Sequence, residues 1–314
     1  MNCKKILLLT TLFSGIAGAG TPNFPDGYTR QKDFQATGKG YGLPSVSAPA
    51  RIVTSGKLAR VAPTATGYGI SYHGGPVMAG PVNVYLIWYG WPAVNPAVPI
   101  VEDLLRGLSG SPYMNILTTY STSAMTISPL IGSITSTFEP ATLGVNLTDA
   151  LIYKILAASI QKRGIADPNG VYFVLTAPAV SSTGFCASFC GWHTASTVSA
   201  TRIKYAFVGD PSAKCPGACG AVNPSPNGIP GADAMALTVA HELVEAITDP
   251  DLTAWYDSTG KENADKCAWK YGTTYTTPTG ARWNVQFGSR RYLLAQNWVN
   301  AKVGAVSGYC DLKW

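Results

Sequence analysis

The sequence has few charged residues, few histidines and no cluster of basic residues. Asp, Glu, Lys and Arg make up 13% of the 314 residues, and only three histidines are present. After the N-terminal lysines, the only adjacent basic residues are the isolated pairs Lys162-Arg163 and Arg290-Arg291, whereas proteins that bind nucleic acids gather Lys and Arg on one face or element. We therefore expect no nucleic-acid partner. No Gly-x-Ser-x-Gly elbow follows a predicted strand, which argues against a serine hydrolase.

Long apolar runs are also missing after the N-terminus. The chain opens with Lys4-Lys5, an apolar run over 6–16 and Ala17-Gly18-Ala19, which is the three-part pattern of a cleavable secretion signal. The run is short for a transmembrane helix, and no second run of spanning length follows. We expect residues 1–19 to be a signal peptide and the mature protein to be secreted and extracellular, with no membrane partner.

Cysteine is absent from the first half of the chain except for Cys3, which lies in the expected signal. Six others follow, at Cys186, Cys190, Cys215, Cys219, Cys267 and Cys310. An even number in an exported chain predicts three disulfides, with 15 possible pairings. A four-cysteine zinc cluster is the competing interpretation of the two Cys-x3-Cys pairs, although structural zinc sites favour other spacings. The sequence thus predicts a C-terminal half stapled by disulfides.

The remaining chain predicts one folded domain with an extended leader. Residues 20–66 are rich in Pro, Gly, Ala, Ser and Thr without periodicity, which indicates a leader, so the domain is expected over 67–314. Apolar patterning predicts strands over 82–89, 125–138, 171–175 and 203–208, and helices over 99–108, 148–163 and 232–247. Strands that alternate with helices favour a single α/β domain with one layered, mixed sheet.

The last predicted helix carries the motif with the clearest chemistry, His241-Glu242-Leu243-Val244-Glu245. Residues four apart share one face of a helix, so His241 and Glu245 can bind one cation while Glu242 activates a bound water. This resembles the His-Glu-x-x-His helix of zincin metallopeptidases, with Glu in place of the second His. Glu245 and Asp249 also lie in the last turn, where the helix dipole disfavours negative charge. A compensating cation is expected there, either a metal ion or one of Lys261, Lys266 and Arg291.

A catalytic zinc site needs a third protein ligand and an open position for water. Glu262 and Asp265 lie downstream, and Asp251 occupies the spacing at which metzincins place their third ligand, although Pro250 interrupts that turn. His193 is a further candidate from a separate segment. Oxygen-rich ligation also suits calcium or manganese. The competing interpretation is an ordinary helix, with its His hydrogen-bonded inside and its Glu residues paired with Lys outside.

Several stretches together resemble the phosphate-induced protein 1, or EXORDIUM-like, family of plant and microbial secreted proteins. The resemblance covers residues 68 to 310 and is carried by 72–77, 84–90, 169–176, Phe185-Cys186, Cys190-Gly191-Trp192-His193, Lys214-Cys215-Pro216, Cys219, the His241 motif, Trp255-Tyr256 and Glu262-x-x-Asp265-x-Cys267. It implies a wall-associated protein linked in plants to growth, with an EXORDIUM-like domain over 67–314. It also implies that His193, His241, Glu242, Glu245, Glu262 and Asp265 form one site. This chain has Asp249 where the plant pattern has Asn.

Two functions from different classes follow. The first is a zinc-dependent hydrolase, most simply a peptidase acting on an extracellular protein or peptide. His241, Glu245 and either Glu262 or Asp265 would hold the metal, and Glu242 would be the general base. The second is a non-catalytic protein that binds cell-wall polysaccharide or acts in growth signalling, with aromatic rings as a sugar-binding surface. Candidate rings are those of Trp88, Trp91, Trp192, Trp255 and Trp283. His73, in a Gly-rich turn, is interpreted as structural.

Overall fold

The centre of the protein is a five-stranded mixed sheet. The computed structural model describes residues 68–314, so the expected signal peptide and the leader over 20–66 lie outside the described residues. The strand order is β3-β2-β5-β8-β7. The first four strands are parallel, and β7 is an antiparallel edge strand beside β8. In that order the strands span Ile131–Glu139, Val82–Tyr89, Gly170–Thr176, Thr201–Gly209 and Gly191–Val198.

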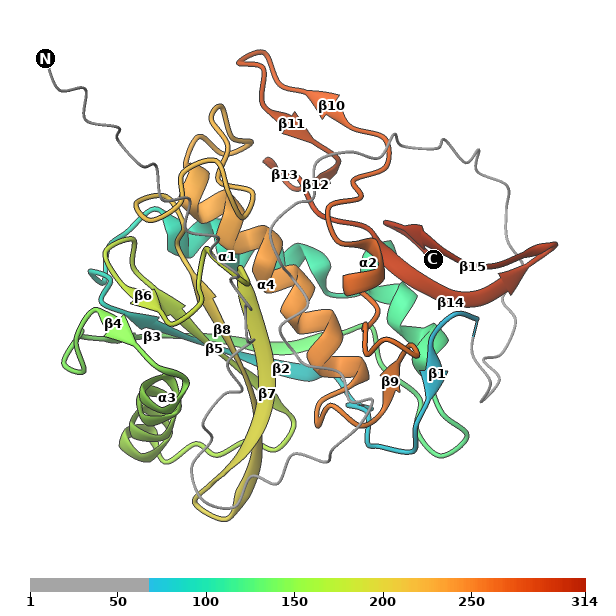
Figure 1. Ribbon diagram of the computed structural model, residues 1–314, viewed down its shortest axis with the longest axis horizontal. Helices are drawn as coiled ribbons and strands as arrows, with labels where there is room; N and C mark the ends of the chain where they lie inside the picture. The colour runs from blue at the N-terminus through green and yellow to red at the C-terminus, as the bar shows by residue number, and fades with distance from the viewer. Residues whose placement is uncertain (1–67) are drawn as a thin grey trace, which may run out of the picture.

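Helices cover both faces of this sheet (Figure 1). Helices α1 (Ala97–Leu108) and α4 (Pro230–Thr248) lie on one face, and α3 (Asp149–Arg163) lies on the other. Successive strand residues point to opposite faces. Accordingly, Leu86 of β2 belongs to the hydrophobic core of α1 and α4, whereas Ile87 belongs to the core of α3. The predicted α/β architecture with a layered mixed sheet is confirmed.

Helix α3 shows how local sequence sets the ends of an element. Its N-cap is Thr148, whose hydroxyl accepts a hydrogen bond from the Leu151 amide at 3.3 Å. Lys162 and Arg163 lie in the last turn, where positive charge complements the helix dipole. Gly164 follows with φ of 66°, a left-handed conformation that glycine adopts without strain. The predicted helix over 148–163 is therefore confirmed almost to the residue.

Helix α4 is buried along nearly its whole length. It starts at Pro230, a residue that suits the first turn because no amide is needed there, and it ends one residue before Asp249-Pro250. Apolar side chains such as Val239 and Leu243 are fully buried. The helix lies between the sheet and the C-terminal part of the chain (Figure 1). Apart from Asp233 in the first turn, the polar side chains of α4 are thus enclosed by protein.

The rest of the described chain forms short helices and two-stranded pairs. These are α2 (Pro112–Asn115), η1 (Ile116–Tyr120), η2 (Asp265–Cys267), β1 (Ser71–Tyr72) with β9 (Trp255–Tyr256), β4 (Asn146–Leu147) with β6 (Ser181–Ser182), β10 (Tyr275–Thr276) with β11 (Arg282–Trp283), β12 (Val285–Phe287) with β13 (Arg290–Tyr292), and β14 (Asn297–Val303) with β15 (Val306–Asp311). Among residues 68–314, no helix has the length and apolar character needed to cross a membrane.

Three disulfides staple the C-terminal half, as predicted. They join Cys186 to Cys215, Cys190 to Cys219 and Cys267 to Cys310. The interpretation of the first four cysteines as a zinc cluster is therefore wrong, because each sulfur is bonded to another sulfur.

Two strand predictions need correction. The strand predicted over 125–138 begins only at Ile131, because Ser128-Pro129-Leu130 forms a connection in which the Ser128 hydroxyl accepts from the Leu130 amide at 3.2 Å. Strand β7 was not predicted, because the segment His193-Thr194-Ala195-Ser196-Thr197 lacks the apolar alternation that marks a strand. Its pairing with β8 and its packing on α4 make it a strand.

Candidate metal centre

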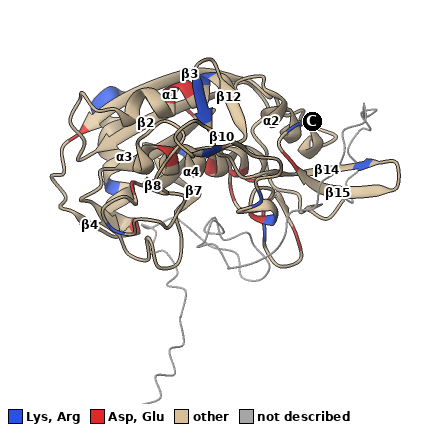
Figure 2. Cartoon of the chain, turned by 90° about the horizontal axis from the view of Figure 1, so that it is seen from above, with Lys and Arg blue, Asp and Glu red and all other residues tan. Residues whose placement is uncertain are grey.

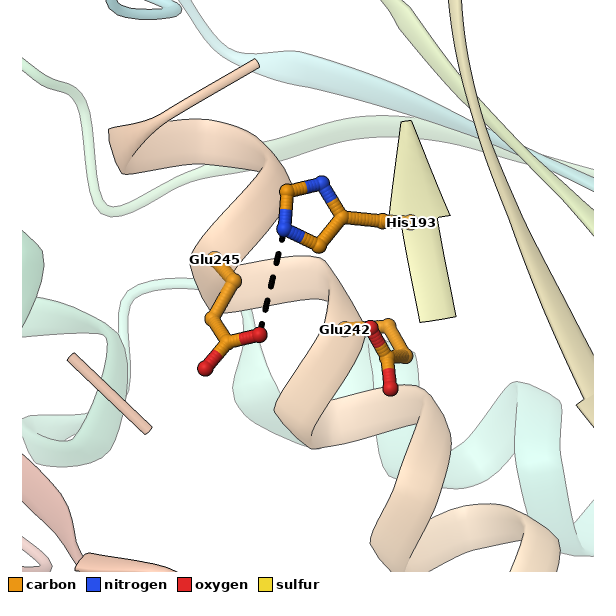
Figure 3. Close-up of side chains that lie close together, drawn as sticks. All are labelled: His193, Glu242 and Glu245. Atoms are coloured by element: carbon orange, nitrogen blue, oxygen red, sulfur yellow. Dashed lines mark ion pairs between the residues drawn. The ribbon is translucent and has the colours of Figure 1, made fainter. Parts of the chain in front are cut away.

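Six side chains named from the sequence converge beside α4. Helix α4 supplies His241, Glu242 and Glu245, strand β7 supplies His193, and the segment after β9 supplies Glu262 and Asp265. All six are buried, with Asp265 the most exposed at 8%. Figure 3 shows His193 reaching from β7 towards Glu245, with Glu242 one turn away on the same helix. Figure 2 shows acidic ribbon segments at α4, within the molecule rather than on its rim.

His241 faces two carboxylates. Its Nε2 lies 3.1 Å from Oε1 of Glu245 and 3.4 Å from Oδ1 of Asp265. The amide of Asp265 donates to the same Glu245 oxygen at 2.9 Å, which ties the downstream segment to the helix. Zinc binds N and O ligands at about 2.0–2.2 Å, so tetrahedral ligands are separated by roughly 3.3–3.6 Å. The spacing of these three side chains fits one zinc-sized ion.

His193 faces a second set of carboxylates. Its Nε2 lies 3.1 Å from Oε2 and 3.2 Å from Oε1 of Glu262, and 3.8 Å from Oε2 of Glu245. Ligand atoms of His193, Glu242 and Glu245 all lie within 4.8 Å of one another, as do those of His241, Glu245 and Asp265. Glu245 is therefore common to two potential ligand sets.

Glu242 is the least satisfied group in the cluster. Both of its carboxylate oxygens are buried without a hydrogen-bond partner in the described part of the chain. Leaving a buried charged group unpaired costs several kcal/mol, and proteins normally pair or neutralise it. A carboxylate in this state is typical of a site that binds a cation or a proton.

Burial and repulsion among the carboxylates shift the pKa values of the cluster. Burial raises the pKa of Glu242 and Glu262 well above the usual value, and repulsion from Glu245 adds to it. Burial lowers the pKa of His193 to about 4. Burial also acts to lower the pKa of His241, but Glu245, Asp265 and Glu242 together outweigh it and raise the pKa to about 10. Without a metal, a proton on His241 partly takes the place of a cation.

Basic side chains do not supply the missing charge. Among residues 68–314, the ion pairs of the cluster carboxylates are with His193 and His241 alone. Lys266 pairs with Asp257 at 2.8 Å instead, and the Arg291 guanidinium lies over the Trp283 ring. Neither of these two residues compensates the carboxylates of the last helical turn, which was one of the alternatives left by the sequence.

Neither Asp249 nor Asp251 belongs to the two ligand sets, although Asp249 is buried close enough to repel Glu245 and Glu262. Oδ1 of Asp249 accepts hydrogen bonds at 2.6 Å from the amides of Thr253 and Ala254, so this carboxylate closes the turn after α4. Asp251 pairs with Arg202 at 3.0 Å. The metzincin-like position therefore contributes no ligand here, in agreement with the weaker case made for it from sequence.

The structure also adds a residue that the sequence did not single out. A Cβ on Gly191 would lie 2.5 Å from Cγ2 of Thr238 and 2.8 Å from Oε1 of Glu242. Glycine at this position therefore lets β7 approach α4 closely enough for His193 to reach the cluster. The sequence shows that Gly191 lies two residues before His193, but it does not show that β7 packs against α4 at this glycine.

Other named residues are structural. The His73 ring stacks on Tyr256 with centroids 3.7 Å apart, and its Nε2 lies 3.1 Å from the Tyr256 carbonyl oxygen. Three of the five tryptophans considered for sugar binding are in the core, at 1% exposure or less, which makes that prediction wrong for Trp88, Trp192 and Trp255. Trp91 packs against Trp88, and Trp283 is partly exposed.

The fold and the site together define an α/β protein with a buried centre of two imidazoles and four carboxylates. Residues 70–303 match the family described as the phosphate-induced protein 1 conserved region, and the chain belongs to this family. This confirms the resemblance seen in the sequence.

Curated relatives are plant proteins. The chain is 29% identical over 283 residues to Protein EXORDIUM-like 3 of Arabidopsis thaliana, covering 77% of this chain and 82% of that protein. It is 30% identical over 240 residues to Protein EXORDIUM-like 5 of the same plant, covering 65% of each. Protein PHOSPHATE-INDUCED 1 of Nicotiana tabacum is 27% identical over 270 residues, covering 72% of this chain and 83% of that protein. No solved structure matches the chain.

Proposed function

We propose that this chain is a secreted, wall-associated binding protein of the EXORDIUM type whose buried cluster holds a divalent metal ion as part of the core. Zinc is the simplest choice for His241, Glu245 and Asp265, and the many oxygen ligands also suit manganese or calcium. The names of the relatives refer to phosphate induction and to EXORDIUM rather than to an enzyme activity. These names support a non-enzymatic role in growth or in the response to phosphate.

Burial of the whole cluster is the observation that carries the non-catalytic assignment. A hydrolytic site must admit its substrate to the bound water, yet His193, His241, Glu242 and Glu245 are each at most 1% exposed. A structural metal site is closed, with its ligands supplied by protein. Enclosure between sheet and C-terminal segments fits that kind of site better than an open cleft.

Secretion is supported by the disulfides. Three disulfides within one half of a chain are typical of proteins that mature in an oxidising compartment. The N-terminal pattern of charged, apolar and small residues agrees with export.

The hairpin formed by β10 and β11 offers a surface for polysaccharide. Tyr275 is 54% exposed, and its ring lies 4.8 Å from that of Trp283 across the hairpin. The guanidinium of Arg291 lies 5.2 Å from the Trp283 ring. Exposed aromatic rings stack on sugar faces, and a nearby guanidinium can donate hydrogen bonds to hydroxyls. Figure 1 places this hairpin at an edge of the molecule, where a long polymer could reach it.

Retention on insoluble glucan and cellulose tests the binding role. We expect the secreted protein to be retained with and without chelator, and Trp283→Ala to lose most of the retention. Tyr153→Ala is the matched control, because Tyr153 is an aromatic residue on α3, away from the hairpin. Equal retention of the wild type and Trp283→Ala would remove the hairpin from the binding surface, and no retention of either would remove polysaccharide as the partner.

A metal-dependent hydrolase is the second candidate, and one observation favours it. The unpartnered carboxylate of Glu242 lies beside the ligand set, where the general base of a zincin-like helix would lie. This chain departs from that motif because its second imidazole comes from β7. If Glu242 is the base, Glu242→Gln should keep the ion at His241, Glu245 and Asp265 and lose peptide hydrolysis. If metal-loaded wild type cleaves none of a broad set of peptides, or if Glu242→Gln cleaves as fast as wild type, this candidate fails.

A further inference from the structure

The two oxygens of Glu245 face different imidazoles. Oε1 lies 3.1 Å from Nε2 of His241, and Oε2 lies 3.8 Å from Nε2 of His193. Each imidazole also has a carboxylate of its own, since Asp265 lies 3.4 Å from His241 and Glu262 lies 3.1 Å from His193. The cluster is therefore two histidine–carboxylate sets joined by one carboxylate, rather than one shell around a single point.

The negative charge of the cluster is large enough to bind two divalent ions. Glu242, Glu245, Glu262 and Asp265 carry four negative charges when ionised, and all are buried. A single divalent ion bound to neutral imidazoles compensates two of these charges and leaves the other two to be neutralised by protons or by a second ion, because unpaired charges are costly in a buried site. Two divalent ions neutralise all four. The second ion would also compensate the carboxylate of Glu242, which is buried beside His193 and Glu245 and whose oxygens have no hydrogen-bond partner in the described residues.

We propose that the cluster is a dinuclear centre in which Glu245 bridges two divalent cations. One ion is held by His241 and Asp265, and the other by His193 with Glu262 and Glu242. Paired metal ions in proteins lie about 3.5–4 Å apart, a separation that one carboxylate can span with an oxygen on each ion. Mixed imidazole and carboxylate ligands suit zinc or manganese at both positions. This inference rests on the proposed metal binding and extends it from one ion to two.

Metal stoichiometry tests the inference on the full secreted chain with its disulfides intact. The protein is dialysed against buffered zinc, or against manganese, and metal per chain is measured by mass spectrometry. We expect two equivalents, and for the manganese form an electron paramagnetic resonance spectrum of a spin-coupled pair. One equivalent would overturn the dinuclear centre while leaving metal binding in place. Metal-free protein would overturn both.

Variants then locate the ions. Glu262→Gln, which preserves size, should reduce binding to one equivalent and abolish the spin-coupled signal. His193→Ala should do the same if it folds, and Glu262→Gln decides the matter if it does not. His73→Ala is the matched control, because His73 stacks on Tyr256 outside the cluster and should keep two equivalents. Two equivalents retained in both Glu262→Gln and His193→Ala would place the second ion elsewhere and overturn the proposal.

Discussion

Replacing Glu242 by Gln should have opposite effects on the metal-free and metal-loaded protein. Burial, with repulsion from Glu245 and Asp265, raises the pKa of Glu242 well above its ordinary value of 4.5. Above pH 4.5, Glu242 is therefore ionised in the unfolded chain but protonated in the metal-free folded protein. Folding then requires the uptake of a proton, which destabilises the folded state. This penalty is absent below about pH 4.5 and grows as pH rises, until the folded-state pKa is reached. Glutamine has the shape of the protonated side chain and carries no such penalty.

The size of the effect follows from the pH difference. Each pH unit costs about 1.36 kcal/mol, so the 2.5 units between 4.5 and 7 set a ceiling of about 3.4 kcal/mol. In chelator, Glu242→Gln should be more stable than wild type by up to that amount at pH 7, and the gain should shrink towards zero near pH 4.5. With zinc present the sign should reverse, because the ionised carboxylate then faces a cation.

Urea unfolding at several pH values, in chelator and in zinc, measures both effects. Glu139→Gln is the control, since Glu139 forms a surface ion pair with Lys162 at 3.3 Å and should change stability by about 1 kcal/mol or less. The reasoning would be refuted by a metal-free Glu242→Gln protein that gains nothing between pH 5 and pH 7. Glu242 would then be neutralised by a contact other than a proton or a metal.

Three further changes test the fold around the centre. Replacing Cys267 and Cys310 by Ser opens a loop with a sequence separation of 43 and should cost about 4 kcal/mol in denaturant unfolding; an unchanged midpoint would contradict this. Leu243→Ala, in the fully buried part of α4, should lower the free energy of unfolding by about 2–5 kcal/mol. Val94→Ala, at a 93% exposed position, is the control and should show no measurable loss in the same denaturant unfolding. Gly191→Ala should lower the free energy of unfolding by about 1–3 kcal/mol, because the added methyl group overpacks the contact between β7 and α4. It should also weaken zinc binding, measured by competition with a chromophoric chelator. Normal zinc affinity would show that β7 can move away from α4 without disturbing the site.

Elements with a clear apolar period were predictable from sequence. The helix over 148–163 and the strand over 82–89 match α3 and β2, because each carries its own apolar pattern and, for α3, its own caps. Strand β7 has polar residues at buried positions, so only its neighbours β8 and α4 make it a strand. The apolar pattern of a single segment does not reveal a strand that is stabilised by tertiary packing.

The residues of the site were predictable, but their arrangement was not. The spacing within α4 places His241 and Glu245 on one face, and Glu262, Asp265 and His193 were further candidates from other segments. The family resemblance added the expectation that these residues form one site. That Glu245 turns one oxygen towards each imidazole depends on how β7 and η2 pack against the helix. Pairing of the six cysteines was likewise open, because 15 pairings are equivalent before the chain is folded.

Two of the disulfides lie next to residues of the cluster, so metal binding at this site would depend on the redox state of the chain. Cys190 precedes His193 by three residues and is bonded to Cys219, while Cys267 follows Asp265 by two and is bonded to Cys310. Reduction would release a ligand-bearing segment on each side of the centre. We expect an order of maturation in which the thiols are oxidised first and the metal is acquired second, and faster loss of metal to chelator in a reductant would reveal it. Because linked equilibria are reciprocal, bound metal would in turn make both disulfides harder to reduce.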